Sequence, residues 1–85
     1  MIKKNITVNL KEGLIARPVA MFVQVASQFE SRIYIETPSM KINAKSIMGM
    51  MTLGMQEGKE LTVTVDGADE AFAIEKIESF LTAGV

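Results

Sequence analysis

The sequence predicts an α+β domain in which one antiparallel sheet of four short strands is covered by three helices on a single face. Two observations lead to this fold class. Apolar residues alternate with polar ones in four short segments, which is typical of strands with one buried face. Three other segments carry apolar residues at helical spacing, so that the order is β-α-β-β-α-β-α. The chain has 85 residues and no internal repeat, and we expect one domain over residues 1–85.

The chain begins with a strand and a helix. Ile6, Val8 and Leu10 alternate with polar neighbours and predict the buried face of the strand. Residues 16–27 follow as a helix, and Pro18 fits its first turn, where a missing N–H loses no bond. The apolar stripe expected on this helix is Val19, Phe22, Val23 and Ala26.

A hairpin and a short helix occupy the middle of the chain. "RIYIE" and "MKINA" are rich in β-forming residues, and Pro38 lies between them in turn-forming sequence. Ser46 then predicts a helix N-cap, because serine is among the preferred capping residues. With Gly54 or Gly58 as its end, this helix should have about two turns.

The last strand and helix are predicted by a change from alternating apolar residues to apolar residues at helical spacing. Leu61, Val63 and Val65 alternate with polar residues, and Gly67 ends the strand. A helix is expected from about Asp69, with an inner stripe made of Ala71, Ile74, Ile77 and Leu81. Asp66, Asp69 and Glu70 lack the spacing of a calcium loop and are interpreted as turn and helix-start charges.

Composition excludes several classes of function. The net charge of −1 provides no broad cationic surface, so we expect no direct binding to nucleic acid or membrane. No apolar run approaches the roughly 20 residues of a membrane span, which favours a soluble, cytoplasmic protein. The chain has neither histidine nor cysteine, so the common catalytic relays and zinc sites are excluded. We therefore predict a protein that is not an enzyme and that has no metal or cofactor.

Two motifs remain as candidate functional segments. "GLIARPVA" leads into the first helix, and "NAKSIMG" leads into the short helix. Helix N-termini present unpaired N–H groups, which suit an anion or a residue that becomes one. Ile15 has no group that can become an anion, so its place before the first helix needs an explanation.

Together with the element order, these motifs resemble HPr, the histidine-containing phosphocarrier family of the bacterial sugar phosphotransferase system. The resemblance covers the whole chain and implies the family's open-faced β-sandwich. It places Ile15 where the family carries the histidine that accepts and donates phosphate. Isoleucine has no lone pair, so the resemblance implies that this chain cannot transfer phosphate through histidine.

The second motif matches the family's regulatory serine. In relatives from Gram-positive bacteria, the serine that matches Ser46 is phosphorylated by an HPr-type serine kinase/phosphorylase, and the product binds a catabolite control transcription factor. The catabolite-repression HPr-like subgroup keeps this serine and lacks the histidine, commonly with glutamine in its place. This chain most resembles that subgroup and departs from it at Ile15.

The resemblance also implies a surface for partners around the two helix starts. Ser46 would be the phosphorylation site, and Ile15 would enlarge an apolar contact surface where the family's histidine acts. Arg17 could bind a partner's carboxylate. The residues expected to contact partners are Ile15, Arg17, Ala20, Gln24, Lys45, Ile47, Met48 and Met51.

Simpler interpretations stay open. Ser46 could be only a helix cap, Arg17 only a solvated charge, and Ile15 a tolerated or engineered replacement. Methionines at helical spacing often fill a core, and we expect Met50 or Met55 inside and Met48 outside. Rival functions are a disabled phosphocarrier, engineered or degenerate, and a structural module of an assembly. We expect a monomer, and a dimer formed by exchange of the first strand is the alternative.

Overall fold

The computed structural model describes residues 1–10, 17–53 and 58–83. Seven elements follow the predicted order. They are β1 (Ile2–Thr7), α1 (Arg17–Ser27), β2 (Arg32–Glu36), β3 (Lys41–Asn43), α2 (Ile47–Met51), β4 (Glu60–Asp66) and α3 (Glu70–Ala83).

The four strands form one antiparallel sheet in the order β1-β4-β2-β3. β4 lies in the middle, where it pairs with β1 from Ile2↔Val65 to Thr7↔Glu60 and with β2 from Arg32↔Asp66 to Glu36↔Thr62. β2 and β3 form the predicted hairpin, which is closed by a hydrogen bond from the Thr37 N–H to the Met40 carbonyl at 2.8 Å. The α+β prediction of one antiparallel sheet is therefore confirmed.

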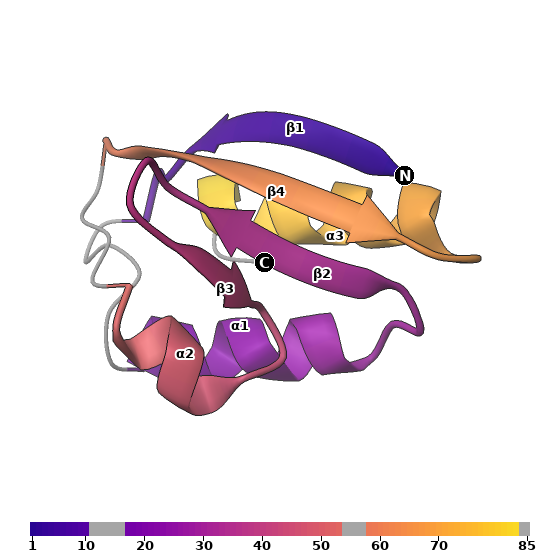
Figure 1. The fold of residues 1–85 in the computed structure, drawn as a ribbon, viewed down its shortest axis with the longest axis horizontal. Coiled ribbons are helices and arrows are strands. Elements are labelled where there is room, and N and C mark those ends of the chain that lie inside the picture. The colour runs from indigo at the N-terminus through magenta and orange to yellow at the C-terminus, as the bar shows by residue number, and fades with distance from the viewer. Residues whose placement is uncertain (11–16, 54–57, 84–85) are drawn as a thin grey trace.

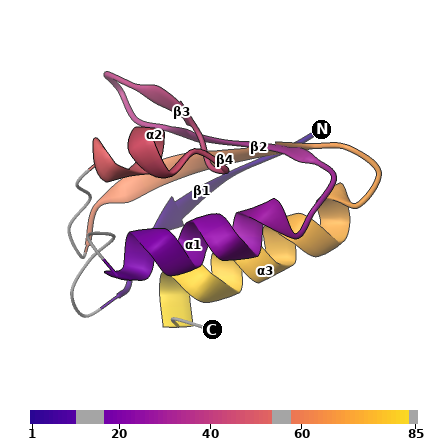
Figure 2. The same ribbon diagram turned by 90° about the horizontal axis from the view of Figure 1, so that it is seen from below.

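All three helices lie on the same side of the sheet. Figures 1 and 2 show α1 and α3 side by side beneath it, with α2 next to β3 and the start of α1. α3 packs against β1 and β4, and α2 packs against α1 and β3. The other face of the sheet has no covering layer among the described elements (Figure 2).

The core lies between the sheet and the helices and is built from the predicted alternating and helical stripes. Strand residues such as Ile6, Val63 and Val65 are buried against Phe22 of α1 and Ile77 of α3. The apolar stripe predicted for α1 is buried at all four positions, which are Val19, Phe22, Val23 and Ala26. Burial of these side chains supplies the main favourable free energy of folding.

Two expectations for helices are corrected. α2 ends at Met51, because Thr52 caps its C-terminus through hydrogen bonds to Gly49 and Met50, so the helix is shorter than two turns. Ala71 is exposed and does not belong to the inner stripe of α3; Ala73 and Phe80 take that side. Gly54 and Met55, both named in the predictions, lie outside the described residues.

A polar contact that the sequence did not predict joins the turn after α1 to the start of α3. The Asp69 carboxylate accepts hydrogen bonds from the backbone N–H groups of Glu30 and Ser31, at 2.9 and 3.0 Å, and from the Ser31 hydroxyl. Gly67 approaches the same turn so closely that a Cβ there would lie 2.6 Å from the Ser31 Cα. We call this group (Asp69, Glu30, Ser31 and Gly67) the Asp69 clasp.

The Asp69 clasp also changes the acidity of its carboxyl group. The hydrogen bond from the Ser31 hydroxyl, followed by that from the Glu30 N–H, lowers the pKa of Asp69 below its ordinary value of 3.8. Hydrogen bonds to a carboxylate favour its charged form. Asp69 is thus a helix-start charge as predicted, but it also binds a second turn.

Over the described ranges 1–10, 17–53 and 58–83, no helix combines the length and apolar character that crossing a bilayer requires.

Candidate functional site

Ser46 is the N-cap of α2, as the sequence predicts. Its backbone is extended, with φ −99° and ψ 113°, and its Oγ accepts a hydrogen bond from the Gly49 N–H at 3.1 Å. The Ser46 side chain is only partly buried. The hydroxyl therefore lies at the positive end of a short helix and is partly accessible to solvent.

Beside Ser46, the outer side of α2 is apolar and exposed. The exposed fractions are 52% for Ile47, 82% for Met48 and 68% for Met51, whereas Met50 is fully buried in the core. Residues three or four apart lie on one face of a helix, so Met51 is a neighbour of both Ile47 and Met48. We call these three residues the α2 surface. The prediction that Met50 or Met55 lies inside and Met48 outside is confirmed for Met50 and Met48.

Two of the predicted site residues on and before α1 are described by the structure. Ala20 and Gln24 are exposed on α1, which packs beside α2 (Figure 2). Arg17 is the first residue of α1, but its side chain lies outside the described part of the structure. Ile15 also lies outside the described residues, so its predicted contact with the α2 surface stays a prediction.

Lys45 has an intramolecular contact that the sequence did not suggest. Its ammonium donates a hydrogen bond to the Phe29 carbonyl at 2.6 Å, and its side chain is partly buried. Its backbone N–H donates to the Asn43 Oδ1 at 2.9 Å. Lys45 thus fixes the segment before Ser46 against the turn after α1, and its predicted role toward partners is untested.

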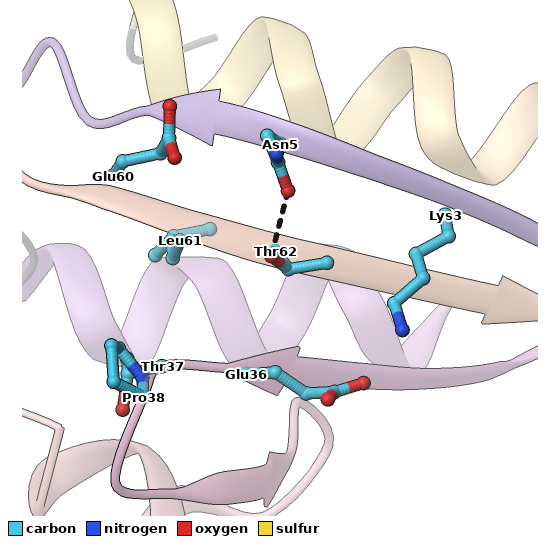
Figure 3. Close-up of a pocket in the computed structure, with 8 residues that line it drawn as sticks. All are labelled: Lys3, Asn5, Glu36, Thr37, Pro38, Glu60, Leu61 and Thr62. Atoms are coloured by element: carbon cyan, nitrogen blue, oxygen red, sulfur yellow. Dashed lines mark hydrogen bonds between the residues drawn. The ribbon is translucent and has the colours of Figure 1, made fainter.

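The uncovered face of the sheet holds a separate polar hollow of about 470 Å³. Figure 3 shows the Asn5 and Thr62 side chains meeting on its floor, where the Thr62 hydroxyl donates to the Asn5 Oδ1 at 2.7 Å. Lys3 and Glu36 line the same hollow. None of the predicted site residues that the structure describes lines the hollow, which lies on the opposite side of the sheet from α1 and α3.

The chemistry that this arrangement supports is modification of a hydroxyl. Phosphorylation adds about −1.5 to −2 charges, and at a helix N-terminus this charge meets N–H groups that already point toward it. The adjacent α2 surface offers flexible apolar side chains for contact with another protein. Within the described ranges, no group of three or more acidic side chains is placed to hold a metal ion.

Comparison with known proteins defines the class to which this fold and site belong. The family model for the "PTS HPr component phosphorylation site" matches residues 2–83. The chain therefore belongs to the HPr family.

Within that family, the chain is similar to proteins named Crh. It is 47% identical over 81 residues to the HPr-like protein Crh of Halalkalibacterium halodurans, which covers 95% of this chain and 96% of the relative. The structure of Bacillus subtilis Crh, a dimer with swapped domains, is 44% identical with a TM-score of 0.78 and covers 100% of this chain and 98% of the relative. The phosphocarrier HPr of Bacillus anthracis is 42% identical with a TM-score of 0.91, covering 94% and 95%. These matches confirm the predicted family and fold.

Proposed function

We propose that this protein is a regulatory member of the HPr family in carbon catabolite repression. An HPr-type serine kinase/phosphorylase phosphorylates Ser46, and the phosphoprotein then acts as co-effector of a catabolite control transcription factor. The observation that carries the proposal is the position of Ser46, a partly exposed N-cap beside the exposed α2 surface. The similarity to Crh proteins supports it.

A chain without histidine has no imidazole to carry a phosphoryl group. In the proposal, Ile15 stands where the family's histidine acts and adds apolar area next to the α2 surface. Arg17 binds a carboxylate of the partner, and the phosphate of Ser46 binds an arginine or lysine of the partner. Such charge-assisted contacts make the phosphate a condition for tight binding.

The first experiment is the intact mass after incubation with ATP and an HPr-type serine kinase, followed by fragmentation of the product. We expect one phosphate, on Ser46. Ser39→Ala, which removes an exposed serine in the β2–β3 turn, is the control and should still accept one phosphate. Absence of phosphate, with an active HPr substrate in the same tube, would leave Ser46 as a helix cap.

The second experiment separates the cap from the phosphate. Ser46→Asn keeps a good N-cap but offers no hydroxyl, whereas Ser46→Ala loses both. Binding to the transcription factor, measured by calorimetry after kinase treatment, should be lost in both variants. Equal affinity of the phosphorylated and unmodified wild-type protein would contradict the proposed switch.

A disabled phosphocarrier is the second candidate, and the high structural similarity to Bacillus anthracis HPr favours it. Ile15→His distinguishes the two functions. Efficient acceptance of phosphate by this variant from the phosphoenolpyruvate-dependent enzyme would indicate that the carrier surface is otherwise retained. Failure of a folded variant to accept phosphate would indicate a surface adapted to other partners.

The oligomeric state is part of the proposal. We infer a monomer, and light scattering on the eluting protein should give the mass of one chain. The domain-swapped dimer of Bacillus subtilis Crh supports strand exchange as the alternative. A stable complex that forms equally well without phosphorylation would instead favour a structural module.

A further inference from the structure

We propose that Met48 and Met51 are reversible oxidation sites, at which a peroxide converts the thioethers to sulfoxides and so weakens binding through the α2 surface. This inference rests on the proposed function, because the α2 surface is the one that the phosphoprotein is proposed to present. Oxidation would be a second modification that controls binding through the α2 surface, and it does not require the kinase.

The exposure of the methionines carries the argument. Met48 is 82% and Met51 is 68% exposed, while Met50 on the same five-residue helix is 0% exposed. A soluble oxidant therefore reaches two of the three sulfur atoms of α2 and is excluded from the third. Met50 is an internal reference of the same residue type, in the same helix, for any measurement of reactivity.

The reaction balances with a peroxide as the only oxidant. The O–O bond of hydrogen peroxide breaks, one oxygen atom forms a bond to the methionine sulfur, and the remainder leaves as water. The sulfur loses two electrons and the peroxide gains them. Methionine sulfoxide reductases reverse the change with two electrons from a dithiol, one enzyme for each sulfoxide epimer.

The consequence for binding follows from the change in polarity. A methionine contact surface is apolar and adaptable, whereas a sulfoxide is polar and chiral. A partner that buries these side chains would then bury polar oxygens that lack hydrogen-bond donors, which is unfavourable. We expect the Kd of the phosphoprotein to rise roughly tenfold or more after oxidation.

The fold should survive the modification. The side of α2 that faces the core is held by Met50, and the helix is capped at Ser46 and Thr52. The exposed thioethers of Met48 and Met51 do not fill the core, so their oxidation creates no cavity there. If oxidation acts on the α2 surface, binding is lost while the melting temperature is unchanged, whereas oxidative unfolding would lower both.

The test starts from protein already phosphorylated on Ser46, treated with hydrogen peroxide and then quenched. Peptide mass spectrometry should show oxygen on Met48 and Met51 well before Met50. Calorimetry with the transcription factor should show the weaker binding, and treatment with both sulfoxide reductases should restore it. Oxidation of Met50 at the same rate as its neighbours would overturn the inference.

Variants identify which methionines matter. Met48→Leu/Met51→Leu keeps apolar side chains that peroxide cannot oxidise, so its Kd should be the same before and after treatment. Met40→Leu, on the β2–β3 hairpin, should leave the peroxide effect in place. Equal binding of oxidised and unoxidised wild-type phosphoprotein would overturn this inference alone. Failure of the unoxidised phosphoprotein to bind would overturn the proposed function and, with it, this inference.

Discussion

Ser31 and Ser46 both make a hydrogen bond at the N-terminus of a helix, Ser31 to Asp69 before α3 and Ser46 within α2. The two serines differ in burial and in the direction of the bond. Ser31 is 1% exposed, and its hydroxyl donates to the Asp69 carboxylate in the Asp69 clasp. Ser46 is partly exposed, and its hydroxyl oxygen accepts one backbone N–H. The Ser31 hydroxyl joins two turns that are distant in sequence, whereas the Ser46 hydroxyl accepts a hydrogen bond within its own helix. Burial and the direction of the hydrogen bond, rather than residue type, distinguish the two serines.

One way to break the Asp69 clasp is Gly67→Ala. The new Cβ would lie 2.6 Å from both the Cα and the Oγ of Ser31, so the two turns must separate. We expect a loss of about 1–3 kcal/mol in the free energy of unfolding, as for other overpacked sites. Urea denaturation measures it, and Ala68→Ser at the neighbouring exposed position should change it by less than about 0.5 kcal/mol.

Replacing each serine by alanine compares the two environments directly. Ser31→Ala removes a partly buried hydrogen bond to a charged group and should cost about 1.5–3 kcal/mol. Ser46→Ala removes a single cap on a short, partly exposed helix and should cost about 0.5–1 kcal/mol. Urea denaturation of the two unmodified proteins measures both values. Equal losses would show that the difference in burial has no energetic consequence.

The Asp69 clasp should also make stability depend on pH. Because the pKa of Asp69 is lower in the folded protein than in the unfolded chain, its contribution is fully present above the unfolded value and is lost as the pH falls through the folded value. As the pH is lowered through 3.8 and below, the urea midpoint should therefore fall more steeply in the wild type than in Asp69→Asn. Ala68→Ser, which changes no titratable group, is the control and should keep the wild-type slope.

Phosphorylation of Ser46 should have the smallest effect on stability. A surface anion at a helix start contributes about 0.3–1 kcal/mol, and less as salt is added. Urea denaturation of the phosphorylated and unmodified proteins, at low and high ionic strength, measures this. A large change, or a change in helix content, would mean that the phosphate reorganises α2 instead of serving as a contact for partners.

Local pattern was enough to predict the order of the strands and helices and the cap at Ser46. Each depends on residues close in sequence, such as the alternation in β4 or the serine before α2. Local pattern was wrong about two ends, because β1 ends at Thr7 and does not include Val8 and Leu10, and α2 is shorter than two turns. The stripe of α3 was wrong at Ala71, because a small apolar residue suits either side of a helix and the sequence does not say which side meets the core. The assignment to the HPr family, which the comparisons confirm, was predicted from the resemblance of the motifs "GLIARPVA" and "NAKSIMG" and not from the periodicity of apolar residues.

The Asp69 clasp and the contact of Lys45 could not be predicted, because each joins turns that are distant in sequence. The signal that was available is weak: Ser31 is a polar residue between the apolar Phe29 and Ile33, and it is buried. Thr64 is similar, since it was expected on the outer face of β4 but is only 7% exposed and donates to Glu36 at 3.2 Å. Ser31 and Thr64 are polar residues of a kind mostly found in solvent, but the fold buries them and gives each a carboxylate as hydrogen-bond partner.

The place of β1 at the edge of the sheet has a consequence for the timing of synthesis. β1 leaves the ribosome first, yet the strand with which it pairs, β4, is near the other end of the chain. At about 5–20 residues per second, β4 emerges several seconds after β1. Throughout that interval β1 has apolar residues but no strand of its own chain to pair with. The pairing of β1 with β4 is therefore among the last contacts of the sheet that can form during synthesis, and slower translation would lengthen that interval.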